Sequence, residues 1–148
     1  MKSQKKILIV GTLPLPIGGV TVHVDRLINA LKKQEEIKFV FKDNTLQNLL
    51  KAPFFLYKNT IHLHSSSPYV RLYYVVLSKI LLAKCIVTIH GDLNRYKSSF
   101  KNFLDKLTVK FSYIPIVLNN KSYSIANKYN NNAVIISSFI PPSSTEKF

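Results

Sequence analysis

The amino-acid sequence predicts a doubly wound α/β fold, in which a mainly parallel, Rossmann-like sheet lies between two layers of helices. Short continuous apolar runs recur along the 148-residue chain, as is typical of strands that are covered on both faces. Segments with helical spacing of apolar residues separate most of these runs. Glycine occurs in only two places, residues 11–19 and Gly91, and each directly follows an apolar run. Strand, turn and helix therefore alternate in a three-layer α/β/α domain.

The first strand is expected over residues 5–10, with Gly11 at its end. A loop with two prolines follows, and the apolar spacing predicts a helix from Val20 to a pair of lysines, cations that favour a helix C-terminus. Further strands are expected over residues 37–41, 60–64, 86–89, 114–118 and 133–137, and the clearest later helices over residues 71–83 and 98–111. Pro115 lacks a backbone N–H, so we expect its strand to lie at a sheet edge or to carry a bulge.

Composition indicates a globular protein of a reducing compartment, and we expect it in the cytoplasm. Hydrophobic residues make up 47% of the chain, far from the composition of a disordered protein. The single cysteine, Cys85, lies inside an apolar run, which indicates a core residue and excludes a disulfide framework. Lys79 and Lys84 interrupt the longest apolar stretch, and the first apolar run is short, so neither a transmembrane helix nor a signal peptide is expected.

The charge balance points to an anionic partner. Lysine and arginine number 21 against 7 acidic residues, which gives a formal net charge of +14. Nucleic acid, an anionic bilayer and a diphosphate substrate all match this excess, and so does a merely solvated lysine-rich surface. Two alternative functions therefore stay open. The first is a non-enzymatic nucleic-acid-binding module, although nucleic acid is the less favoured partner. The second is a nucleotide-binding domain of another enzyme class, although this sequence lacks the dinucleotide-binding fingerprint.

Candidate site residues follow the predicted strands, where open α/β sheets bind their ligands. Gly18 and Gly19 precede the helix at Val20, whose unpaired N–H groups and positive dipole end suit a phosphate or carboxylate, although a plain turn has the same pattern. His90 follows a strand directly, where an imidazole can exchange hydrogen bonds with a bound hydroxyl. Asp92 either orients His90 or a substrate, or caps the next turn.

Other chemistries find less support in the sequence. His62 and His64 share one face of a strand, but no third ligand is evident, so no metal is expected. His23 lies beside the apolar stripe of the first helix, where it can simply pack. Acidic residues are scarce and no Gly-x-Ser-x-Gly elbow occurs, which disfavours a two-carboxylate hydrolase and a serine nucleophile.

Four motifs, in order, resemble the N-terminal half of retaining GT-B glycosyltransferases of the family-4 type. They are residues 6–11 (Lys-Ile-Leu-Ile-Val-Gly), 16–24 (Pro-Ile-Gly-Gly-Val-Thr-Val-His-Val), 61–64 (Ile-His-Leu-His) and 87–91 (Val-Thr-Ile-His-Gly). The match covers nearly the whole chain. Its most specific parts are the Pro-x-Gly-Gly-Val loop with His23 after it and the strand-end His-Gly.

The resemblance implies two Rossmann-like domains that face a cleft, the N-terminal one mainly for the acceptor and the C-terminal one for the nucleotide-sugar donor. It implies that His90 is catalytic and faces the transferred sugar. The substrate-binding residues that it implies are Gly18, Gly19, Val20, His23, Ser65, Ser66, Gly91 and Asp92. It implies no cofactor and no metal, because helix dipoles and basic residues stabilise the departing diphosphate.

The resemblance also sets the expected domain organisation. Residues 1–140 would form the N-terminal domain and residues 141–148 the start of a linker or tail, with the donor-binding domain absent. The chain alone is then expected to bind acceptor weakly and to be inactive. The expected acceptor is a saccharide or lipid-linked sugar of envelope or capsule polysaccharide synthesis. Peripheral attachment to an anionic inner membrane face is a further expectation, with lysines 97, 101, 106 and 110 beside an aromatic stripe; a solvated rim is the alternative.

Overall fold

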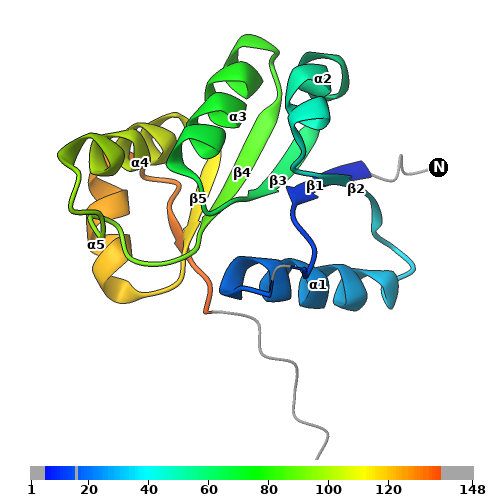
Figure 1. The fold of residues 1–148 in the computed structure, drawn as a ribbon, viewed down its shortest axis with the longest axis horizontal. Helices are drawn as coiled ribbons and strands as arrows, with labels where there is room; N and C mark the ends of the chain where they lie inside the picture. Colours follow the sequence, from blue (N-terminus) through cyan, green and yellow to red (C-terminus); the bar gives the residue numbers. More distant parts are fainter. Residues whose placement is uncertain (1–5, 16, 138–148) are drawn as a thin grey trace, which may run out of the picture.

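The computed structural model describes residues 6–15 and 17–137, and this part of the chain forms one six-stranded sheet with five helices (Figure 1). The strands lie in the order β2-β1-β3-β4-β5-β6, and every neighbouring pair is parallel. The strands are β1 (Lys6–Gly11), β2 (Lys38–Asp43), β3 (Thr60–His64), β4 (Lys84–Ile89), β5 (Ile114–Val117) and β6 (Val134–Ile135). The helices are α1 (Gly19–Lys32), α2 (Leu46–Leu56), α3 (Pro68–Ile80), α4 (Ser99–Phe111) and α5 (Asn120–Tyr129). The predicted doubly wound, Rossmann-like fold is confirmed.

The bounds of the predicted elements differ from the observed ones by at most three residues. Strand β3 has the predicted bounds, but α3 begins earlier, at Pro68, because Ser67 caps its first turn. The expectation for Pro115 is wrong, since β5 lies between β4 and β6 in a regular parallel ladder. Strand β6 pairs only with Ile116 and Val117, so the proline lies outside that short ladder.

Side-chain caps mark helices α2 and α5, whose bounds the apolar spacing does not predict. Thr45 Oγ1 accepts a hydrogen bond from the Asn48 amide at 3.3 Å, and Asn119 Oδ1 accepts one from the Ser122 amide at 2.8 Å. Pro53 lies inside α2, where a proline removes one helical hydrogen bond. The start signals of these two helices are therefore polar caps.

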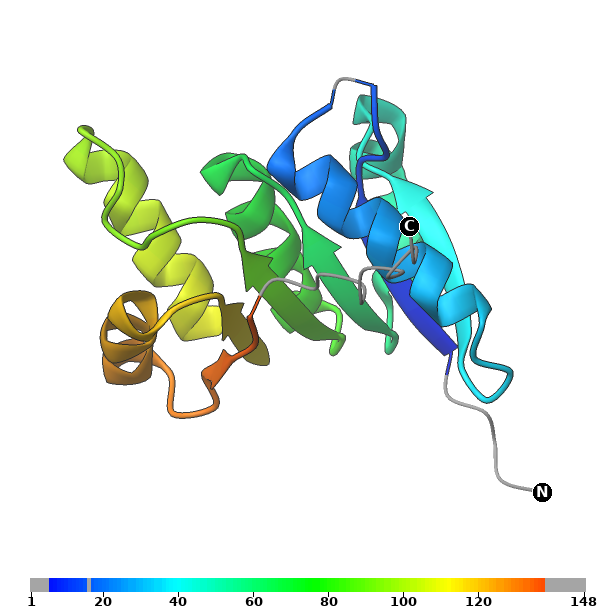
Figure 2. The same ribbon diagram turned by 90° about the horizontal axis from the view of Figure 1, so that it is seen from below.

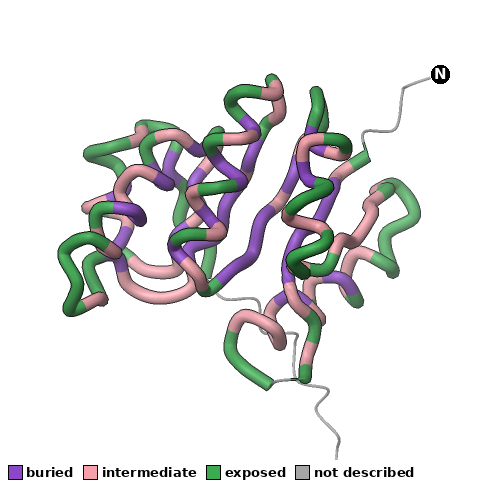
Figure 3. Tube along the Cα trace, turned by 45° about the horizontal axis from the view of Figure 1, so that its top comes forward, coloured by how far each residue is buried: buried purple, intermediate pink, exposed green. Residues whose placement is uncertain are grey.

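Helices cover the two faces of the sheet unequally (Figures 1 and 2). Helix α1 lies on one face, where Val24 and Ile28 pack against Ile9 of β1. Helices α2, α3 and α4 lie on the other face, over the larger hydrophobic core. Figure 3 shows that buried positions follow the central strands. Ile86 and Ile114 are in register with Ile9 across the sheet, on the same face, but they are only half-buried.

The strand order places a switch point between β1 and β3. The chain moves from β1 to β2 in one direction, and from β3 to β6 in the other. At such a point the connections diverge from the carboxyl ends of the two strands and leave a crevice for a ligand. The loops that follow β1, β3 and β4 lie along this edge, so the fold directs the search for a site here.

Two expectations concern regions beyond the sheet. The proposed linker, residues 141–148, lies outside the described residues, as do Lys5 and Pro16. Among the helices of residues 6–15 and 17–137, none combines the length and the apolar character that a bilayer crossing requires. Cys85 is buried in β4, and burial raises its pKa to about 12, so the thiol is a core group as predicted.

Candidate functional site

All four histidines of the chain gather at the carboxyl edge of the sheet, beside the switch point. His62 and His64 stand on β3, His23 on α1, and His90 directly after β4. The ring centroid of His23 lies 5.3 Å from that of His64 and 4.8 Å from that of His90. His64 also lies 4.2 Å from His62 and 5.3 Å from His90, measured between ring centroids. Three elements that are distant in the sequence thus share one imidazole cluster.

A close approach of α1 to the strand ends makes this cluster possible. Gly11 ends β1, and a Cβ added there would lie 3.0 Å from Cγ2 of Val24 and 3.5 Å from Cβ of His64. The first distance is shorter than ordinary van der Waals contact, so a side chain at residue 11 would push α1 away. Gly11 therefore brings His23, the neighbour of Val24, over the edge of β3.

Hydrogen bonds hold three of the rings, and two ring nitrogens have no partner among the described residues. Nδ1 of His64 and Nε2 of His90 lie 3.1 Å apart, so one ring donates to the other. Nε2 of His62 lies 2.8 Å from the Thr88 hydroxyl. Among the described residues, Nδ1 of His23 and Nε2 of His64 are buried without a hydrogen-bond partner. Such unpaired polar atoms are costly in a protein interior, so these two nitrogens are available to a hydrogen-bond partner from outside the described chain.

Burial keeps the cluster uncharged at neutral pH. Desolvation lowers the pKa of His62 to about 4 and that of His90 to about 3. It also lowers the pKa of His64 well below the ordinary value, and repulsion from the neighbouring rings adds to this effect. The pKa of His23 is lowered by burial and by the Arg26 guanidinium. Each neutral ring presents one N–H donor and one lone pair, so the cluster can bind hydroxyl groups or a metal ion.

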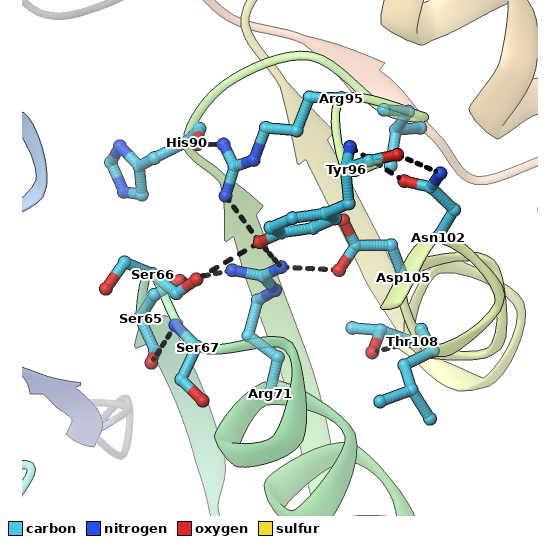
Figure 4. Close-up of polar contacts among 12 residues, drawn as sticks. Ser65, Ser66, Ser67, Arg71, His90, Arg95, Tyr96, Asn102, Asp105 and Thr108 are labelled. Carbon is cyan, nitrogen blue, oxygen red and sulfur yellow. Dashed lines mark hydrogen bonds and ion pairs between the residues drawn. The ribbon is translucent and has the colours of Figure 1, made fainter. Parts of the chain in front are cut away.

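The loop after β4 holds His90 through its backbone. Gly91 has a φ of +111°, a conformation that side chains rarely adopt, and a Cβ there would overlap the Arg95 guanidinium. Arg95 donates to the His90 carbonyl and, at 2.8 Å, to the Tyr96 hydroxyl (Figure 4). Glycine is therefore needed at residue 91 to let the arginine fold back over the strand end.

A buried ion pair connects the loops after β3 and β4. Arg71 on α3 pairs with Asp105 on α4, and both side chains are fully buried. Arg71 also donates to the Ser65 carbonyl at 2.6 Å, and the Tyr96 hydroxyl lies 3.4 Å from the Ser66 carbonyl (Figure 4). Arg71 and Asp105 are absent from the sequence prediction. The only sequence signal for them is a charge on the buried side of each helix, which does not reveal the partner.

The predicted glycine loop opens α1 at the same edge. Gly18 is the N-cap residue of α1 in extended conformation, and the Thr21 hydroxyl accepts from its amide at 2.9 Å. A Cβ on Gly19 would meet no described atom within 4 Å, so packing within the described chain does not require glycine there. Val20 is half-buried and packs against the small hydrophobic core of Ile9, Val24 and Ile28. His23, on the second turn of this helix, faces His90, so the two predicted loops lie on one edge of the sheet.

The remaining predicted residues have mainly local partners. Ser65 is buried and its Oγ accepts from the Ser67 amide at 3.2 Å, whereas Ser66 is exposed. Asp92 lies beside the start of α5 rather than on His90. Its carboxylate accepts from Asn119 Nδ2 at 2.7 Å and lies 3.7 Å from the Lys121 ammonium. These contacts tie Asp92 to the start of α5, and neither of them is with His90 or with the turn that directly follows Asp92.

Comparisons with known proteins bear on the fold. No protein-family model matches the chain, and no curated protein matches it either. Two crystal structures of Anabaena HepE, one with UDP and one with UDP-glucose, are similar to it, with TM-scores of 0.60 and 0.61 at 15% sequence identity. The similar region covers 91% of this chain but 44% of HepE, so the chain spans less than half of that protein. The chain thus has the Rossmann-like α/β fold that is also found within HepE.

Proposed function

We propose that this chain is the acceptor-binding half of a glycosyltransferase, which moves a sugar from a nucleotide-sugar donor to a saccharide or lipid-linked acceptor of envelope or capsule polysaccharide. The observation that carries the proposal is the cluster of neutral imidazoles beside the first turn of α1 at the switch point. The fold shared with HepE, whose crystal structures contain UDP and UDP-glucose, supports it.

The neutral rings suit a sugar better than an anion. In the proposed reaction, His90 is the catalytic residue that faces the transferred sugar, and His23 binds a neighbouring hydroxyl. An uncharged imidazole can donate to one hydroxyl and accept from another, which matches the alternating polarity of a sugar. The unpaired nitrogens of His23 and His64 would gain partners when the sugar binds.

The amides at the start of α1 supply the complementary anion site. The first-turn N–H groups of a helix have no acceptor within that helix, and the dipole makes this end positive. Space beside Gly19 lets a phosphate approach the backbone closely. In this proposal, a diphosphate group of the acceptor or the donor lies at residues 18–20, and the sugar extends from there toward His90.

Arg71 and Asp105 act as positioning residues in this proposal. Their ion pair is buried, and through the Ser65 carbonyl and Tyr96 it holds the loops after β3 and β4 together. Neither charged group is exposed, so neither contacts the substrate directly. Their role is to keep the exposed Ser66 and the backbone of His90 at fixed places on the edge.

We also propose that the protein attaches peripherally to an anionic bilayer through an apolar helix face. Exposed apolar side chains gather on three helices: Leu46, Leu50 and Phe54 on α2; Tyr69, Tyr73, Val76 and Ile80 on α3; Phe100 and Phe103 on α4. The apolar residues of helix α4 do not all face the core. Leu104 is buried, whereas Phe100 and Phe103 are 59% and 52% exposed. The net charge of +14 favours an anionic lipid surface as the partner.

Amide NMR of the full chain tests the acceptor assignment. A soluble short-chain prenyl-diphosphate sugar is expected to shift the amide signals of residues 18–20, His23 and Gly91 at millimolar concentration. A His90→Gln variant should weaken this binding, whereas Tyr129→Ser, which changes an exposed residue of α5, should not. Shifts confined to other elements, or a stronger response to UDP-glucose than to the acceptor mimic, would contradict the acceptor-side assignment.

A further inference from the structure

Three imidazoles of the cluster meet the requirements of a metal site. His23, His64 and His90 each offer one ring nitrogen, and these atoms all lie within 4.8 Å of one another. We infer that these three side chains bind a transition-metal ion, with Zn²⁺ as the representative cation. This inference concerns the cluster itself and does not depend on the glycosyltransferase proposal.

The distances are near those of a zinc site. With Zn–N bonds of about 2.0–2.1 Å and tetrahedral angles, neighbouring ligand nitrogens lie about 3.3–3.4 Å apart. The nitrogens of His64 and His90 already lie 3.1 Å apart. No pair in the triad exceeds 4.8 Å, so a shift of about 1.5 Å brings the widest pair to the tetrahedral spacing. His64 is fully buried, so the adjustment falls to His23 and His90, which are half-buried.

The ring nitrogens are chemically ready to bind. A metal ion binds the lone pair of an imidazole nitrogen, and each of the three rings offers one such nitrogen to the same point. His64 is fully buried, and its Nε2 and the Nδ1 of His23 have no partner among the described residues. Coordination through Nδ1 would give the His23 ring the partner that it lacks among the described residues, while His64 would bind through Nδ1, the atom that faces His90.

The donor set selects the kind of cation. Three imidazoles without a carboxylate favour zinc, copper or nickel, while magnesium and calcium require oxygen ligands. Three protein ligands leave a fourth position for water or an anion. No metal is expected from the sequence, because only His62 and His64 are seen to share a strand face there. In the structure, His23 and His90 complete the triad with His64, and His62 instead shares a hydrogen bond with the Thr88 hydroxyl.

Isothermal titration of zinc chloride into the full chain, prepared without a polyhistidine tag, tests the inference. At pH 7.5 we expect one saturable site per chain. His23→Gln and His90→Gln should each weaken zinc binding at least tenfold. His62→Gln and Cys85→Ser serve as controls and should change the affinity less than threefold, because neither side chain belongs to the triad. Magnesium chloride should give no saturable binding.

A second readout locates the ion. Cobalt(II) in place of zinc should give the intense visible absorption of a four- or five-coordinate complex, and its paramagnetic effects should be strongest at His23, His64 and His90. Circular dichroism must show that each variant remains folded. The inference is overturned if no saturable zinc binding occurs at millimolar concentration, if the triad variants bind as the unchanged protein does, or if cobalt effects centre elsewhere. Because both proposals use His23, His64 and His90, the acceptor titration is run with EDTA, so that its outcome is separate from that of zinc binding.

Discussion

The two faces of the sheet solve opposite problems. On the α1 face, the chain desolvates four titratable rings, of which His64 is fully buried, and leaves two of their nitrogens unpaired among the described residues. On the opposite face, α2, α3 and α4 bury a continuous apolar core and leave large apolar side chains exposed on their outer surface. Each face thus departs from ordinary packing in its own way, and each departure is typical of a surface that meets a partner. A polar ligand fits the first face and an apolar surface the second.

The largest expected effect comes from breaking the buried ion pair between α3 and α4, which lies on the face opposite α1. Arg71→Met leaves Asp105 buried without its partner, which should lower the free energy of unfolding by about 3–5 kcal/mol. Urea denaturation at pH 7.5 measures the loss. The double variant Arg71→Met with Asp105→Leu removes both charges and should recover at least half of it. Equal loss of stability in the single and double variants would show that the hydrogen bond from Arg71 to the Ser65 carbonyl matters more than the charge on Asp105.

Acid should destabilise the histidine face. An unfolded histidine binds a proton below about pH 6.5, whereas His62 in the folded protein resists protonation down to a pKa of about 4. Protons therefore favour the unfolded chain, and stability falls as the pH drops from 6.5 toward 4, by about 1.4 kcal/mol per pH unit for each ring that stays neutral. Urea denaturation between pH 7.5 and 5 checks this; His62→Gln should reduce the slope, and a flat profile would contradict the account.

Two glycines of the same edge should respond differently to a methyl group. Gly91→Ala forces a side chain into a left-handed conformation and against Arg95, so we expect a loss of about 1–3 kcal/mol. Gly19→Ala meets open space at the start of a helix and should leave stability unchanged or slightly higher, while it weakens binding of the acceptor mimic. Thermal unfolding of both variants measures the contrast. A destabilised Gly19→Ala protein would show that residue 19 is packed.

The smallest effect on stability is expected on the apolar helix face. Phe54 is 87% exposed, so Phe54→Ser should change the free energy of unfolding by less than about 0.5 kcal/mol. The same change should reduce co-flotation with phosphatidylglycerol-rich vesicles, and vesicles of phosphatidylcholine alone should bind weakly. Tyr129→Ser on α5 is the matched control. Equal flotation of all three proteins would remove the proposed membrane surface.

The sequence predicts the fold well because its apolar runs mark the strands, and a glycine marks the end of two of them. Gly11 and Gly91 directly follow apolar runs, and those runs are strands in the structure. Side-chain contacts between a helix and the strand ends are harder to predict. The contact of His23 with His64 and His90 depends on how closely α1 approaches β3, which the space beside Gly11 determines. No local pattern encodes that distance.

Charged residues show the same limit. Arg71 and Asp105 lie 34 positions apart on different helices, and sequence reasoning has no means to pair them. Asp92 is the acidic residue that sequence proximity links to His90, yet its carboxylate turns to Asn119 and Lys121. Adjacency along the chain is thus a poor guide at a site where loops from several strands meet.

The central claim is that four desolvated imidazoles cluster at one edge of the sheet and stay neutral at physiological pH. Histidine-ring ¹H–¹⁵N NMR, recorded from pH 8 to pH 3 on the full chain, tests it most directly. The account predicts that all four rings titrate below their ordinary pKa, with His62 near a pKa of about 4 and His90 near about 3. Rings that titrate independently at about pH 6.5, as free histidine side chains do, would contradict it.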